Sequence, residues 1–118
     1  MDPRNKNFKI PGDQIRRLIR NMVACYATDR ITVDGLKVGY MFREFPDEDV
    51  FSGWVFMSGD ESQEYADNAD NWAIYDVNTI CNYDPAIIPF LDAVLNTAYG
   101  RVAGTDRFEE EPFDPIAE

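Results

Sequence analysis

The sequence has 118 residues, of which 45% are hydrophobic and 14% aromatic, and its formal net charge at pH 7 is −11. A chain of this size can form one domain with one core, and its apolar content is too high for a disordered protein. It contains no histidine, which excludes zinc sites of the usual type and catalysis by Ser-His or Cys-His pairs.

The charge is distributed unevenly along the chain. Residues 1–20 carry six basic and two acidic groups, whereas the other 98 residues carry five basic and twenty acidic groups. The negative charge of residues 21–118 repels phosphate backbones and anionic lipids, but it attracts basic protein surfaces. We therefore expect a basic protein partner, with no nucleic acid and no membrane. The alternative, that the acidity only maintains solubility, stays open.

The first residues, MDPRNKNFKIPGDQ, contain no apolar stretch of the kind found in signal peptides, and no apolar stretch in the chain reaches 18 residues. A cytoplasmic location is the default expectation. Cys25 and Cys81 each lie among apolar residues without the spacing of a metal site, so we expect two buried free thiols.

The first predicted elements in chain order are a helix and a short strand. Apolar residues recur at helical spacing from Ile15 to Met22, and Asp13 can cap the first turn, so we expect an amphipathic helix over residues 12–22. Residues 23–28 predict a strand. The basic side chains of the helix fall on its exposed flanks.

Residues 29–43 predict a β-hairpin, because two strand-like runs flank an Asp34-Gly35 turn. In the second run Val38, Tyr40 and Phe42 alternate with other residues, which indicates one buried face. Residues 44–53 predict a loop that contains a proline and the acidic cluster Asp47-Glu48-Asp49, and a strand follows from Trp54.

The second half of the sequence predicts alternating short helices and strands. A turn at residues 58–62 leads into a short acidic helix capped by Asp60 or Ser58, followed by a strand over residues 71–77. Helical turns are then expected with Asp84 as N-cap before Pro85, and a last strand near residues 97–104. Residues 105–118 read as an acidic C-terminal tail or strap.

These elements predict an α+β fold, with a largely antiparallel sheet of four or five strands and two to four short helices. Residues 1–104 are expected to form the single globular domain. The sequence does not set the order of the strands.

An acidic ridge is the first candidate site. On a helix residues 60, 64 and 67 share one face, so we expect Asp60, Glu61, Glu64 and Asp67 to form this ridge. Tyr65 and Trp72 flank it and could anchor a partner. A solvated helix face is the alternative. No base accompanies Ser58 or Ser62, so we expect no catalytic residue there.

Two further hypotheses use other residues. In the first, Arg43, Trp54 and Asp60 line a pocket for a small molecule, as in a ligand-sensing or housekeeping domain. In the second, Asp60, Glu61 and Asp76 support metal-assisted hydrolysis, although their spacing is not that of metal ligands. We expect no metal and no cofactor.

Several motifs occur together in one order over residues 23–101. This set resembles the bacterial immunity protein family thirty-three, and its motifs are Gly39-Tyr40-Met41, Arg43-Glu44, Ser52-Gly53-Trp54, Ser58-Gly59-Asp60-Glu61, Tyr65 and Asp76-Val77-Asn78-Thr79. The family commonly has an acidic residue before the Ser-Gly-Trp motif, whereas this chain has Phe51, so an acidic role there does not carry over.

The resemblance implies a function in polymorphic toxin systems. Such a protein is cytoplasmic, is not an enzyme, and binds and neutralises a cognate toxin. We expect the acidic surface to meet a basic surface of that toxin. The basic N-terminal segment and the acidic C-terminal segment lie outside the shared core.

Overall fold

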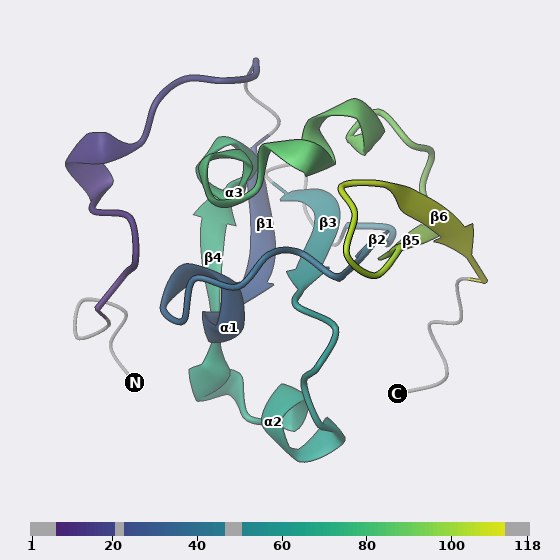
Figure 1. The fold of residues 1–118 in the computed structure, drawn as a ribbon, viewed down its shortest axis with the longest axis horizontal. Helices are drawn as coiled ribbons and strands as arrows, with labels where there is room; N and C mark the ends of the chain where they lie inside the picture. The colour runs from purple at the N-terminus through teal and green to yellow at the C-terminus, as the bar shows by residue number, and fades with distance from the viewer. Residues whose placement is uncertain (1–6, 21–22, 47–50, 113–118) are drawn as a thin grey trace.

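The computed structural model describes residues 7–20, 23–46 and 51–112 (Figure 1). Its strands are β1 (Ala24–Thr28), β2 (Tyr40–Arg43), β3 (Phe51–Met57), β4 (Trp72–Asp76), β5 (Thr97–Arg101) and β6 (Phe108–Glu111). They form one sheet in the order β4-β1-β3-β2-β5-β6, in which β1 and β3 run parallel and the other described pairs are antiparallel. The predicted α+β fold is confirmed, with six strands and a mixed sheet.

The helices are short. They are η2 (Gly12–Gln14), α1 (Asp29–Thr32), α2 (Gln63–Asp67), η3 (Ala69–Asn71), α3 (Val77–Tyr83) and η4 (Pro85–Phe90). Asp84 caps η4 by accepting from the backbone N–H of Ala86 at 3.1 Å, and Pro85 begins that helix, as the sequence predicts. Within the described residues no helix is long and apolar enough to cross a membrane.

The predicted amphipathic helix over residues 12–22 is wrong. Only η2 is helical, and the chain beyond it is held by side-chain amides of α3. Asn78 accepts from the backbone N–H of Leu18 at 2.7 Å and donates to the carbonyl oxygen of Arg16 at 2.8 Å. Because these amides satisfy backbone groups that a helix would bond internally, helical spacing alone did not decide the structure. Met22 lies outside the described residues.

The predicted hairpin at Asp34-Gly35 is also wrong. The predicted first arm contains the helical turn α1, which buries Ile31 and ends at Thr32, and Gly35 follows it with φ of +78°. The N–H groups of Val33 and Asp34 both bond to the carbonyl oxygen of Asp29, so the turn satisfies its own backbone and offers no edge for pairing. β2 instead pairs with β3 and β5.

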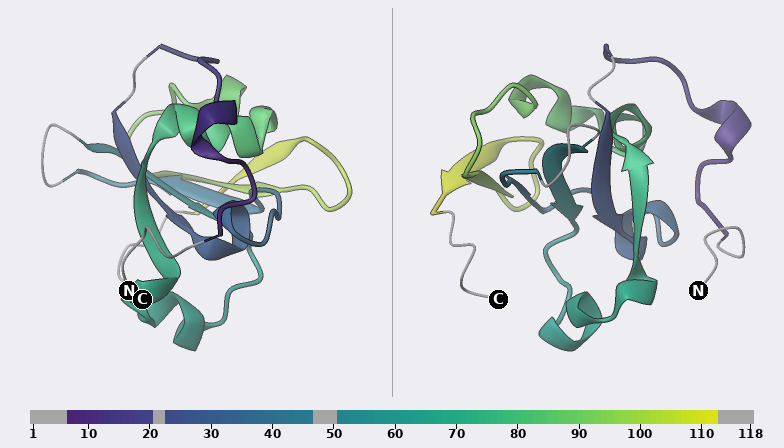
Figure 2. Two further views of the ribbon diagram at one scale, coloured as in Figure 1. Left: turned by 90° about the vertical axis from the view of Figure 1, so that its left-hand side faces the viewer. Right: turned by 180° about the vertical axis from the view of Figure 1, so that it is seen from behind.

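The hydrophobic core lies between the sheet and the helices α3 and η4. Trp54, Phe56 and Met41 point to this side and are fully buried, and both cysteines are free and buried, as predicted. Seen from behind, the strands β1 and β4 have no helix over them (Figure 2). The sheet therefore has one covered face and one open face.

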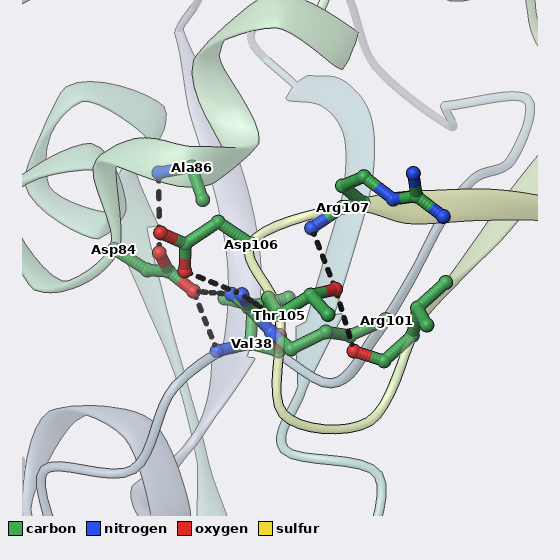
Figure 3. Close-up of polar contacts among 8 residues, drawn as sticks. Val38, Asp84, Ala86, Arg101, Thr105, Asp106 and Arg107 are labelled. Atoms are coloured by element: carbon green, nitrogen blue, oxygen red, sulfur yellow. Dashed lines mark hydrogen bonds and ion pairs between the residues drawn. The ribbon is translucent and has the colours of Figure 1, made fainter.

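Residues 108–111 extend the sheet as β6, although the sequence assigned them to a tail or strap. Phe108 packs against Phe90 with ring centroids 5.3 Å apart, which explains why this acidic segment folds back. The neighbouring side chain of Arg101 bonds Asp84 and the carbonyl oxygen of Val38 (Figure 3). Residues 113–118 lie outside the described part.

Candidate functional site

The acidic segment after β3 forms a turn and then α2. Ser62 is the N-cap, and its hydroxyl accepts from the backbone N–H of Tyr65 at 3.0 Å, so the prediction of Asp60 or Ser58 as cap is wrong. Because α2 begins at Gln63, residues 60 and 61 precede it. The structure therefore puts only Glu64 and Asp67 of the predicted ridge on the helix.

Glu61 organises the turn. Its carboxylate accepts from the backbone N–H of Ser58 at 2.8 Å and of Gly59 at 2.9 Å. It also accepts from the Thr28 hydroxyl at 2.7 Å, which ties the turn to the end of β1. A carboxylate with three donors inside its own fold is a structural group, and it has little capacity left for a partner.

Asp60 and Tyr65 both lie beside Arg30 of α1. The guanidinium is 3.6 Å from the Asp60 carboxylate and 5.1 Å from the centre of the Tyr65 ring. Partial burial and the nearby carboxylate of Asp29 raise the pKa of Tyr65, whereas Arg30 lowers it. The two predicted site residues are thus brought together by a cation from α1, outside the acidic segment.

Glu64 and Asp67 are exposed at the surface of α2. Asp67 accepts from the Gln63 amide at 2.8 Å. The indole N–H of Trp72 donates to the carbonyl oxygen of Ala66 at 2.8 Å, which holds the indole against the helix. Of the predicted site residues, Asp67 and Trp72 line one surface feature, and Glu64 lies on the same helix as Asp67.

That feature is a groove of about 570 Å³ on the open face of the sheet, closed at one end by α2 and η3. Strand residues form its floor, and acids occur at its edge. It is lined by Tyr26, Phe42, Glu44, Val55, Met57, Gln63, Ala66, Asp67, Ala69 and Trp72. A second hollow of about 180 Å³ shares Tyr26 and Glu44 and continues to the exposed Phe45.

The floor of the groove was missed from the sequence. We expected Tyr40 and Phe42 on the buried face of their strand, but Met41 is the fully buried residue of β2, and Tyr40 and Phe42 lie on the open face. The strand does alternate between two faces, but the face that carries Tyr40 and Phe42 is the open one. Which face a helix covers depends on contacts between distant segments.

The charged side chains that line the groove are acidic. No lysine, arginine or histidine occurs between Arg43 and Arg101, a stretch that supplies most of the groove. The acids of α2 and its flanks are Asp60, Glu61, Glu64, Asp67 and Asp70. Because exposed like charges add up over a surface, this region has a negative potential.

Arg43 and Trp54 lie together on the covered face. The guanidinium is 5.9 Å from the indole centre and donates to the carbonyl oxygens of Ser52 at 2.9 Å and Ala93 at 2.8 Å. Trp54 is fully buried and donates to the carbonyl oxygen of Leu91 at 3.1 Å. The third residue of that hypothetical pocket, Asp60, lies beyond the end of β3 beside Arg30.

The carboxylates of the metal-assisted hydrolysis hypothesis make separate structural hydrogen bonds. Asp76 caps α3 by accepting from the N–H of Asn78 at 2.9 Å, and Glu61 holds the turn described above. Over residues 7–20, 23–46 and 51–112, no group of three or more His, Cys, Asp or Glu side chains could hold a metal ion. The cluster at residues 47–49 lies outside the described residues.

The fold and the site define a small α+β domain with an open sheet face that is apolar in its groove and acidic around it. The family model for the Immunity protein Imm33 domain matches residues 25–111, so the chain belongs to this family of immunity proteins. The match runs from β1 to the last residue of β6 and confirms the resemblance seen in the sequence. Searches of curated proteins and of solved structures found no match.

Proposed function

We propose that the protein neutralises a cognate toxin by binding it directly and occluding it, without catalysis and in the cytoplasm. Membership of the immunity protein family is the observation that carries this proposal. The surface of this protein that we expect to contact the toxin is the acidic region around α2. Its charged groups are Asp60, Glu64 and Asp67, and its aromatic anchors are Tyr65 and Trp72. Glu61 supports this surface from within the turn.

The negative charge around α2 favours a partner with a basic surface. Among the residues that the structure describes, the cation seen in contact with this acidic segment is Arg30, which is engaged with Asp34, Asp60 and Tyr65. A negative surface accelerates association with a basic protein and makes the rate depend on ionic strength. A toxin that acts on nucleic acid commonly has such a basic surface, because it must bind phosphates.

The test uses the cognate toxin domain, which is to be sought first in the gene next to this one. Cells that produce this domain should survive when the protein is co-expressed, and the purified pair should elute as one complex. Glu64→Lys with Asp67→Lys should weaken binding and lower its salt dependence. Glu109→Lys with Glu110→Lys, the same number of charge reversals on the exposed strand β6, should leave both close to wild type.

A wild-type protein that neither protects cells nor binds the toxin domain would refute the proposal. Protection without a complex would refute direct occlusion and would favour a sensing or housekeeping function. If the α2 double variant binds with unchanged affinity and salt dependence, the acidic surface is assigned to the wrong place.

A further inference from the structure

The groove on the open sheet face joins several strands into one apolar surface. Its floor comes from Tyr26 on β1, Phe42 on β2, and Val55 and Met57 on β3, and Trp72 of β4 forms a wall. On the other face equivalent side chains are covered by α3 and η4. Here Tyr26 remains 38% exposed, and Ile74 beside it in the β1–β4 register remains 55% exposed.

The groove has the composition of an interface core. Aromatic side chains and methionine are enriched at such cores, because they bury a large apolar area. The polar atom of Trp72 is already satisfied by Ala66, so its ring can pack against a partner without losing a hydrogen bond. The ring of Tyr26 is held by stacking on Phe51, with centroids 5.3 Å apart and planes 3° from parallel.

The charge at the rim limits what can occupy the groove. Asp67 and Glu44 contribute the charged side chains of the lining, and the lining contains no lysine or arginine. Arg43, next to Glu44 in sequence, points to the covered face and bonds backbone oxygens there. A second copy of this chain would bring acidic rims together, which costs free energy.

We propose that the groove receives an apolar side chain from a loop or extended segment of the bound toxin, and that Asp67 pairs with a lysine or arginine beside it. This rests on the proposed function, and it identifies the part of the surface that supplies affinity. The exposed acids of α2 increase the association rate. The groove supplies the contact that slows dissociation.

The experiment measures the affinity of the same toxin domain for variants of the full chain by calorimetry, and its dissociation rate by surface plasmon resonance. Ala66→Phe fills the groove from α2, and Tyr26→Ser removes part of its floor. Each should weaken binding at least about tenfold, mainly through faster dissociation, as expected for the core of an interface. Asp67→Asn should reduce the salt dependence of binding.

Leu36→Ser is the matched control. Leu36 follows α1, does not line the groove, and is 40% exposed, close to the exposure of Tyr26. It should bind the toxin domain like wild type. Thermal unfolding of every variant separates loss of the groove from loss of the fold, since Ala66→Phe adds to an open surface and should leave the melting temperature almost unchanged.

The two proposals fail in different ways. If the wild-type chain does not bind the toxin domain, the proposed function and the groove assignment both fail. If the wild type binds and the folded groove variants bind equally well, only the groove assignment is overturned. A dimer of the free chain that Ala66→Phe dissociates would also overturn it, because the occupant would then be a second copy.

Discussion

Asp84, which is buried, and Arg101, which is largely buried, form an ion pair that joins the start of η4 to the end of β5 (Figure 3). The Asp84 carboxylate also accepts from the backbone N–H of Val38 at 3.0 Å, and the Arg101 side chain donates to the carbonyl oxygen of the same residue at 2.7 Å. The pair therefore ties the segment before β2 to two other parts of the chain. Asp106 adds a second, exposed partner for Arg101 at 3.1 Å.

Asp84→Asn should lower the free energy of unfolding by about 3 kcal/mol, because it leaves the guanidinium of Arg101 without its charge partner inside the fold. Asp106→Asn is the control. Its carboxylate is 88% exposed, and we expect a change of less than about 1 kcal/mol. Urea unfolding of the two variants measures both values, and equal losses would contradict the structural role of Asp84.

Glu61→Ala should destabilise the fold by about 2 kcal/mol, since it removes a carboxylate that accepts from Ser58, Gly59 and Thr28. Glu64→Ala, three residues later on the exposed surface, should change stability by less than about 0.5 kcal/mol. Chemical unfolding compares them. A large effect of Glu64 or none of Glu61 would show that the two acids were assigned the wrong roles.

Gly39→Ala should destabilise the sheet by about 2 kcal/mol or more. A Cβ atom at this position would lie 1.9 Å from the backbone carbonyl oxygen of Ser58, so the main chain itself must move. At Gly100 a Cβ atom would meet only the end of the Glu111 side chain, which can rotate away. Gly100→Ala should therefore be tolerated, and melting temperatures of the two variants test the difference.

Both thiols should react slowly in the folded protein. Burial is the main cause that raises the pKa of Cys81 from 9.0 to about 12, and the carboxylate of Asp76 is the next cause. The same two causes raise the pKa of Cys25 well above 9.0. At pH 8 the thiolate fraction of Cys81 should then be about a thousandfold lower than in a free thiol. Reaction with a chromogenic disulfide should be slow in buffer and should reach two thiols per chain in guanidinium; rapid native reaction would contradict this.

Stability should fall at alkaline pH. Burial raises the pKa of Tyr75 from 10.0 to about 12, although its hydrogen bond with Thr32 opposes the shift, and Cys81 shifts in the same direction. The neutral forms are favoured by folding, so their contribution is complete below pH 9 and is lost as pH rises toward 12. Tyr75→Phe should make the decline less steep, as measured by melting temperature from pH 8 to 11.

Sequence patterns predicted the helices and strands correctly where adjacent residues favour the same structure. The strands near residues 24–28, 72–76 and 97–101 and the cap at Asp84 follow from apolar runs, a proline and a capping residue, and they occur in the structure. The failures at residues 12–22 and 29–35 occurred where distant or competing groups satisfied the backbone. Asn78 bonds the N-terminal segment, and α1 bonds itself.

In the candidate site, too, some residues follow from the sequence and others depend on tertiary contacts. Sequence identified Glu64, Asp67 and Trp72 as surface residues near an acidic helix. It could not identify Tyr26 or Met57, because their exposure depends on the side of the sheet that α3 and η4 cover. Nor could it separate Glu61 from its neighbours, since its role comes from a hydroxyl on β1 far away in the chain.

The sequence by itself determined the class of fold, the negative charge, the absence of histidine and the family. These properties depend on composition and on the order of short motifs, which every folded arrangement of the chain retains. Only the tertiary structure decided the strand order, the parallel pairing of β1 with β3, and the open face with its groove. Those depend on which distant apolar surfaces meet, because burial is a property of the whole packed chain.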